Sequence, residues 1–189
     1  FAVPSPIQSY AHLRLHNGTI WRWNRMLIGF DDKDQPHLRV EQRVMPAGPS
    51  IVDMIANAAF YYGAVCMLAR QQVAPESQLP FAVARENFYR AARAGLGARL
   101  VWFDGREVSA VELLERQLLP LAREGLMRLE LDAADVARYL QVIAGRLRSR
   151  QNGAAWQLAH YAKHRDFFRL TADYLEHQRR LMPVHEWPI

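Results

Sequence analysis

The stretch that most constrains the fold is His16–Arg43, where two runs with strand-like alternation flank the polar turn 31–34. Side chains of a β-strand alternate between its two faces, so every second residue shares a face. In the second run one face is mostly apolar and the other is charged; the apolar face carries Leu38, Val40, Gln42 and Val44, and the charged face carries His37, Arg39, Glu41 and Arg43. The pattern predicts an antiparallel strand pair that packs its apolar face on a core.

The charged face of the second run suits a site that holds a metal ion and phosphate oxygens. It places a carboxylate between two guanidinium groups, with an imidazole at one end. Carboxylate oxygens are the ligands that hard divalent cations take, and the arginine fork matches the geometry of phosphate and carboxylate oxygens. An ordinary solvated sheet face is the alternative, because alternating charges are common where one face of a sheet meets water.

The first run adds weight to the functional interpretation of the hairpin. Thr19, Trp21, Trp23 and Arg25 share one of its faces. The run also contains many large, polar-tipped groups for a plain surface hairpin, namely Trp21, Arg22, Trp23 and Arg25. Asp53, which follows the hairpin, also has two interpretations. It is either the cap of a helix that begins at Ser50 or a polar group of an active site.

Composition limits the classes of function that the chain can have. Its 189 residues fit one domain or part of a larger one, and its 24 basic and 19 acidic residues favour anionic ligands such as nucleotide phosphates. The positive charges are interspersed with acidic ones, which argues against nucleic acid as a partner. Cys66 is the single cysteine, so no internal disulfide forms, and a reducing cytoplasm is the expected location.

Beyond the hairpin the sequence predicts a mainly helical second half, and therefore an α+β fold. We expect a short strand at Tyr10–Leu15 and a turn at His16–Gly18, a small hairpin over Leu100–Val108, and helices over Ile51–Gln72, Phe81–Ala94, Ala110–Glu124, Asp132–Arg148 and Ala154–Leu181. The first helix has an apolar stripe suited to the back of the sheet, formed by Ile51, Met54, Ile55, Ala58, Tyr62 and Val65. Asp53 and Asn57 interrupt this apolar window, which favours a buried helix over a membrane span.

Two further groups of side chains on the helices carry both a structural and a functional interpretation. Arg90 and Arg93 share a helix face, where they meet either an anion or solvent. His160 and His164 have a spacing that suits metal binding, but no third ligand accompanies them in the sequence.

Three segments of the chain resemble the C-terminal half of the glutamate–cysteine ligase family, in its bacterial carboxylate–amine ligase branch. The segments are HNGTIWRWNR, HLRVEQR and PAGPSIVDMIANAAF, and the matching positions are His16, Gly18, Thr19, Trp21, Asn24, Arg25, Arg39, Glu41, Arg43, Pro46, Ala47, Gly48, Pro49 and Asp53. The chain departs from the family pattern mildly, at Val40, Gln42 and Ser50. Family members are longer, and their N-terminal half, which has metal-binding glutamates of its own, has no counterpart here.

The resemblance implies a glutamine-synthetase-like sheet curled into a funnel, with the active site on its concave face. Residues 1–189 are then a single domain or the C-terminal part of a larger catalytic domain, with strands in 1–49 and mainly helices in 50–189. The implied reaction is ATP-dependent amide formation. A carboxylate, that of glutamate in the usual case, becomes an acyl phosphate that an amine attacks. The implied cofactors are ATP and Mg²⁺.

The resemblance also implies a role for each site residue. Glu41 is the magnesium ligand, Arg43 is a catalytic phosphate clamp, and Arg39 is a second nucleotide-binding arginine. Arg25 grips a substrate carboxylate, and His16 and Thr19 line the same pocket. Because the family assembles its site from both halves, we expect the isolated chain to be inactive.

The expected partners are ATP and small amino-acid substrates, with no nucleic acid and no membrane, and a homo-oligomer is possible. Two other classes remain open, a non-enzymatic helical interaction module and a nucleic-acid-binding domain that uses arginine and tryptophan.

Overall fold

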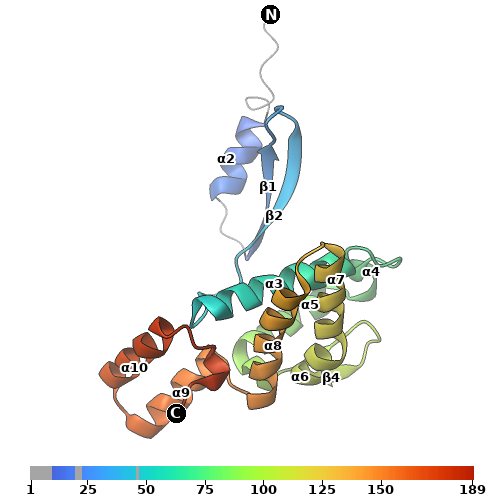
Figure 1. Cartoon of the computed structure of the whole chain (residues 1–189). Helices are drawn as coiled ribbons and strands as arrows, with labels where there is room; N and C mark the ends of the chain where they lie inside the picture. Colours follow the sequence, from blue (N-terminus) through green and yellow to red (C-terminus); the bar gives the residue numbers. More distant parts are fainter. Residues whose placement is uncertain (1–9, 20–22, 46) are drawn as a thin grey trace, which may run out of the picture. The chain divides into compact units, whose positions relative to one another are not determined.

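The computed structural model of the protein describes residues 10–19, 23–45 and 47–189 (Figure 1). The chain divides into two compact units, residues 1–47 and residues 48–189. The described parts are mostly helical and contain two small antiparallel sheets. The predicted α+β class is therefore confirmed.

The first unit consists of helix α2 (Ala11–Thr19) and the strands β1 (Asn24–Phe30) and β2 (Pro36–Gln42). The strands pair in antiparallel fashion, as predicted. The strand at Tyr10–Leu15 and the turn at His16–Gly18 were wrong predictions, because these residues form α2. Ala11, Leu13, Arg14 and Leu15 are good helix formers, and the segment has no β-branched residue before its last position. Helix α2 contacts β1, with the rings of Tyr10 and Phe30 6.2 Å apart.

The turn between the strands is fixed by the side chain of Asp31. Its Oδ1 accepts hydrogen bonds from the backbone N–H groups of Lys33, at 2.8 Å, and Gln35, at 2.9 Å. These bonds stabilise the charged carboxylate and hold the pKa of Asp31 below its usual value. Asp34 takes the left-handed backbone conformation, with φ of 57°, that short polar residues tolerate in turns. The polar turn predicted from the sequence is thus the point at which the chain reverses.

The apolar face of the hairpin differs from the prediction. Leu38 and Val40 are 67% and 63% exposed, and Met26 on the same face is also exposed. The alternation in the sequence identified the face correctly but not its surroundings, because periodicity shows which side chains share a face and not what covers them. Part of the first run, residues 20–22, lies outside the described residues.

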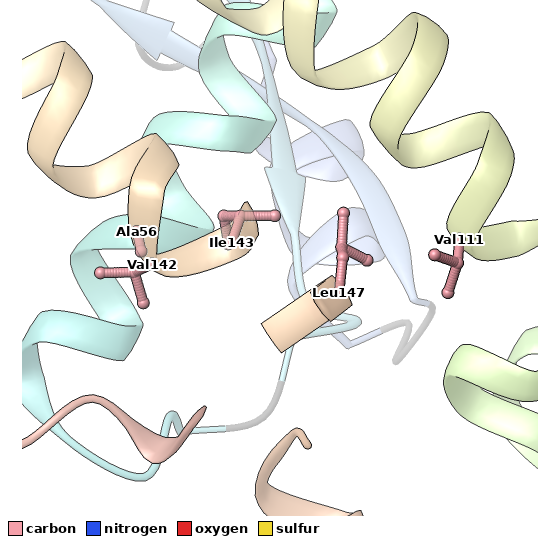
Figure 2. Packing of buried hydrophobic residues seen from close by; sticks show 5 residues of the cluster. All are labelled: Ala56, Val111, Val142, Ile143 and Leu147. Carbon is pink, nitrogen blue, oxygen red and sulfur yellow. The ribbon is translucent and has the colours of Figure 1, made fainter. Parts of the chain in front are cut away.

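The second unit is built on α3 (Ile51–Leu68), which packs against α7 (Leu119–Arg128) and α8 (Ala133–Ser149). The α3 and α7 backbones touch at two glycines. A Cβ on Gly63 would lie 2.2 Å from the carbonyl oxygen of Ala122, and one on Gly125 would lie 2.0 Å from that of Gly63. One core cluster of the unit consists of Ala56, Val111, Val142, Ile143 and Leu147 (Figure 2). The apolar residues that recur at helical spacing along α8 form its buried face: Val136, Leu140, Ile143 and Leu147.

The other helices of the second unit leave most of the apolar stripe of α3 uncovered, and its packing on the back of the sheet stays a prediction. Ile51, Met54, Ile55, Tyr62 and Val65 are exposed. The helix instead buries its small residues, because Gly63 and Ala64 allow the close approach of α7. By length and composition alone α3 is also long and apolar enough to cross a membrane. This is weak evidence of a membrane span, because core helices pass the same test and α3 packs against α7 and α8.

The remaining elements follow the predicted order. They are α4 (Pro75–Gln78), α5 (Phe81–Ala94), a 3₁₀ turn (Gly95–Gly97), β3 (Arg99–Val101), β4 (Glu107–Ser109), α6 (Ala110–Leu113), a π-helical segment (Leu114–Leu118), α9 (Gly153–His164), α10 (Phe167–Arg179) and a second 3₁₀ turn (Val184–Glu186). Pro120 follows the π-helical segment and lies in the first turn of α7, where its missing N–H is tolerated. The helical region expected over Ala154–Leu181 consists of two helices, α9 and α10.

Candidate functional site

The pairing of β1 with β2 gathers three charged residues of the predicted site into one group, which we call the arginine–glutamate cluster: Arg25, Glu41 and Arg43. Arg25 lies directly opposite Glu41 in the strand register. Oε2 of Glu41 forms ion pairs with Nε of Arg25 and, at 3.0 Å, with Nε of Arg43. Arg43 follows the last residue of β2, and its N–H donates to the carbonyl of Trp23 at 2.9 Å, which extends the strand pairing by one step. The side chains of Glu41 and Arg43 therefore project from the same strand face, as the alternation predicted.

The arginine–glutamate cluster keeps its carboxylate charged and partly accessible. The Glu41 side chain is 34% exposed, against 16% for Arg25 and 22% for Arg43. Hydrogen bonds from Arg43 and then from Arg25 favour the ionised form, so the pKa of Glu41 lies below its usual value. A metal ligand of the carboxylate type must be deprotonated. Glu41 meets that condition at neutral pH.

A second pair of basic side chains lies on the same face, over Gly29. In the strand register Gly29 is opposite His37. A Cβ on Gly29 would lie 2.6 Å from Nη2 of Arg39 and 2.7 Å from Cε1 of His37. Both side chains thus cross β1 where it has no side chain. Neither forms an ion pair with any residue in the described part of the chain, whereas both other arginines of this face pair with Glu41.

The side chains around Glu41 fit a magnesium ion bound together with phosphates better than a closed protein cage. Magnesium in such sites is held by one or two carboxylates, and waters and substrate phosphates complete its octahedron. Glu41 supplies one ionised carboxylate of this kind. Within residues 10–19, 23–45 and 47–189 there is no group of three His, Cys, Asp or Glu side chains that could enclose a metal. The same finding leaves His160 and His164, whose rings are 4.6 Å apart, without a third ligand.

The other two pocket residues expected from the sequence belong to α2. His16 is exposed there, and the side chain of Thr19 lies outside the described residues. Their role as a pocket lining therefore stays a prediction, as does the expectation that Glu41 and Arg43 face a cavity. Trp21, which shares the predicted face with Arg25, lies outside the described residues as well.

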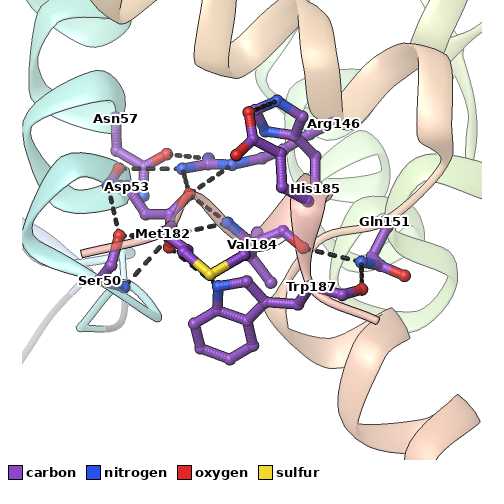
Figure 3. A network of polar contacts seen from close by, with 10 residues as sticks. Ser50, Asp53, Asn57, Arg146, Gln151, Met182, Val184, His185 and Trp187 are labelled. Carbon is purple, nitrogen blue, oxygen red and sulfur yellow. Dashed lines mark hydrogen bonds and ion pairs between the residues drawn. The ribbon is translucent and has the colours of Figure 1, made fainter. Parts of the chain in front are cut away.

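Asp53 occupies a structural position, which answers the question left open by its sequence pattern. Its side chain and that of Ser50 form a reciprocal cap at the start of α3. Oδ1 of Asp53 also pairs with Nη2 of Arg146 at 2.6 Å, and Oδ2 accepts from the N–H of Val184 at 3.1 Å (Figure 3). The carboxylate is fully buried. It ties the start of α3 to α8 and to the C-terminal segment.

Arg90 and Arg93 lie among acidic side chains of the second unit. Arg90 pairs with Glu86 at 3.2 Å and with Glu107 at 3.0 Å. Arg93 is 72% exposed and lies 4.0 Å from the same Glu86. These contacts favour the solvated-face interpretation over an anion site.

Sequence reasoning missed Gly29 as a residue of the charged face. A glycine inside a strand pattern often marks a position where another group approaches the backbone closely, and this was the available signal. His37 stood in the predicted charged row but received no role. The structure shows that the two residues are linked, because the imidazole occupies the space that a Gly29 side chain would need.

The first unit thus carries a carboxylate between two arginines on one strand face, which are side chains of the kind that bind divalent cations and anions. The sequence matches the family model described as glutamate-cysteine ligase family 2 over residues 19–173. This is most of the chain, so the protein belongs to that family, which is a family of ligases. Searches of curated proteins and of solved structures found no match.

Proposed function

We propose that this protein is part of an ATP-dependent ligase that joins a carboxylate, that of glutamate in the first instance, to an amine through an acyl phosphate. The observation that supports the proposal is the arginine–glutamate cluster, which lies within the segment matched by the family. Charge neutralisation in fixed positions is the main means of catalysing phosphoryl transfer. A carboxylate that binds a cation, with guanidinium groups beside it, provides that means.

Each side chain of the charged face has a distinct task in the proposal. Glu41 holds Mg²⁺, which would neutralise phosphate charge when bound. Arg43 clamps the transferring phosphoryl group, and Arg39 contacts the nucleotide phosphates. Arg25 orients a substrate carboxylate through its planar fork.

The ion pairs of Glu41 suggest how cation and anion binding depend on each other. Arg25 and Arg43 share a single carboxylate oxygen with their Nε atoms. When a cation occupies Glu41, both guanidinium groups lose part of their counter-charge and gain affinity for anions. Substrate carboxylate and phosphate then take the place of Glu41 beside them. In this proposal the cation and the anions bind cooperatively, because each ligand raises the affinity of the arginine–glutamate cluster for the next.

The proposal includes the wider setting that the family resemblance implies. The strands are part of a glutamine-synthetase-like sheet, and His16 and Thr19 line its pocket. The complete active site needs residues beyond this chain, and the protein works in the cytoplasm on small molecules. Assembly into a homo-oligomer is compatible with the proposal.

The test is Mg²⁺-dependent nucleotide binding by the 189-residue chain, measured by isothermal titration with ADP. We expect weak binding that strengthens with Mg²⁺, and loss of this dependence in Glu41→Gln, which keeps the shape of the side chain but not its charge. Equal magnesium dependence in both proteins would reject Glu41 as the ligand. We also expect no turnover from this chain alone, so ADP release that needs both glutamate and cysteine would contradict a divided site.

A further inference from the structure

The convergence of His37 and Arg39 over Gly29 is the feature of the hairpin that the arginine–glutamate cluster does not explain. Nη2 of Arg39 and Nε2 of His37 lie 2.6 Å and 2.9 Å from the single point that a Gly29 Cβ would occupy. Two basic groups are therefore held side by side on one strand face. Basic groups repel each other when both are charged, so their convergence favours an anion between them.

Space, and not backbone conformation, requires the glycine at this position. Gly29 is a strand residue and is not among the residues with positive φ. An alanine would adopt the same backbone without strain. The atoms that its Cβ would meet are the far ends of two flexible side chains, which can swing aside. Alanine here would consequently separate His37 from Arg39 without disturbing the strand pairing.

Two acidic side chains of the hairpin, Glu41 and Asp31, already have partners. Glu41 takes Arg25 and Arg43. Asp31, whose charge acts on His37, accepts two backbone hydrogen bonds that hold the turn. Arg39 has no carboxylate partner within the part of the chain that the structure describes. Its guanidinium is exposed and able to bind an anion from solution.

We propose that His37 and Arg39 form a binding site for a chain of phosphates, and that Gly29 is the positioning residue that brings them together. Two adjacent donors with several N–H groups match consecutive phosphoryl groups, whose oxygens accept charge-assisted hydrogen bonds. The inference rests on the proposed function, because it names the part of the face that receives the polyphosphate of the nucleotide. It adds His37 and Gly29 to that site.

Inorganic tripolyphosphate is the probe, titrated into the whole chain with a chelator present so that no divalent cation takes part. We expect His37→Gln and Arg39→Gln each to weaken binding about tenfold, the loss of one hydrogen bond to a charged group. Gly29→Ala should weaken it by a similar factor with an unchanged unfolding midpoint. Gly97→Ala is the matched control, since a Cβ on Gly97 has no atom within 4 Å, and it should leave binding unchanged.

A positioning role makes a further demand on Gly29. In the chain that carries both His37→Gln and Arg39→Gln, adding Gly29→Ala should change binding no further. A Gly29→Ala chain that binds as the wild type, or one that still loses affinity in that doubly substituted background, would overturn the proposal. So would a single-stranded oligonucleotide that displaces tripolyphosphate at a lower concentration with the same dependence on these residues, because it would assign the site to nucleic acid.

The two proposals fail separately. Tripolyphosphate binding that follows His37, Arg39 and Gly29, combined with nucleotide binding indifferent to Mg²⁺ and Glu41, would reject the proposed function and keep the phosphate site. The opposite combination would reject the phosphate site alone.

Discussion

Asp53 and Glu41 are two carboxylates of the same family-like sequence region that serve opposite ends. Each is paired with arginine, Asp53 with Arg146 and Glu41 with Arg25 and Arg43. Asp53 is fully buried and also accepts hydrogen bonds from backbone N–H groups and a hydroxyl. Glu41 is about one-third exposed and, within the described residues, receives only guanidinium groups. The first carboxylate has no capacity left for a ligand, and the second does.

This difference is the one expected between an ion pair that serves the fold and one that binds ligands, which is the role proposed for Glu41. A buried charge is tolerated only when its partners replace the hydration that it has lost, which is why Asp53 is bonded to the helix start, to Arg146 and to Val184. A ligand-binding charge must keep exchangeable partners and access to solvent. Glu41 keeps such access, and in the proposed function its two arginines turn from the carboxylate to an incoming anion.

Breaking the buried pair should produce the largest effect on stability. Arg146→Met removes the guanidinium and leaves the carboxylate of Asp53 buried without its counter-charge. We expect a loss of about 3–5 kcal/mol in the free energy of unfolding, measured by urea denaturation. Arg148→Met, on an exposed position of the same helix, is the control and should stay within about 0.5 kcal/mol of the wild type. Equal effects of the two changes would remove the contrast between the buried and open clusters.

Glu41→Gln should have a large effect on catalysis and a small effect on stability, in contrast to Arg146→Met. In an intact enzyme that contains this chain, we expect kcat to fall by about 10²–10³-fold, or about 3–4 kcal/mol, the usual cost of losing one preorganised charge stabiliser. Added Mg²⁺ should restore activity only in part. The unfolding free energy should change little, since the pair is partly exposed to solvent. Near-normal turnover in the folded variant would return this face to the solvated-surface interpretation.

Replacing the arginines of the charged face by lysine should rank them by their contribution to catalysis. Arg43→Lys keeps the charge but loses the bidentate fork, so we expect a lower kcat with a smaller change in KM for the amine. Arg39→Lys should cost less than either Arg43→Lys or Glu41→Gln, because a single ammonium still serves a phosphate. Steady-state kinetics of the three variants under one set of conditions gives the order. A larger loss from Arg39→Lys than from Arg43→Lys would contradict the assigned roles.

The sequence predicted those parts of the fold whose cause is local. The α5 helix, the cap at Asp132 and the pairing of Arg25 with the Glu41 strand follow from periodicity, capping chemistry and a turn that Asp31 closes. It failed where the cause lies in contacts between distant residues. The exposed stripe of α3 reflects a backbone approach at Gly63 and Gly125, and no pattern within α3 reveals its partner. The candidate site was found through its charges, but Gly29 became visible only when His37 and Arg39 were seen to cross it.

The smallest predicted effect is a change in stability at acid pH, which an acid titration of Glu41 and Asp31 measures. The pKa of both carboxyls is depressed, that of Glu41 by Arg43 and then Arg25, and that of Asp31 by backbone N–H groups. A depressed pKa in the folded state adds stability above the unfolded value, near 4.5 for Glu41, and that stability is lost as the pH falls through the folded value.

The titration also tests which contacts hold the Glu41 carboxylate. The titration is followed by the chemical shifts of the side-chain carboxyl groups. Arg43→Met should raise the titration midpoint of Glu41 more than Arg25→Met does, because the hydrogen bond from Arg43 is the largest cause of the lowered pKa of Glu41. The midpoint of Asp31 should stay where it is in both variants, since its partners are in the turn backbone. A shift of both midpoints together would mean that the arginines act on the whole hairpin, and that Glu41 is not a separately held, exchangeable ligand.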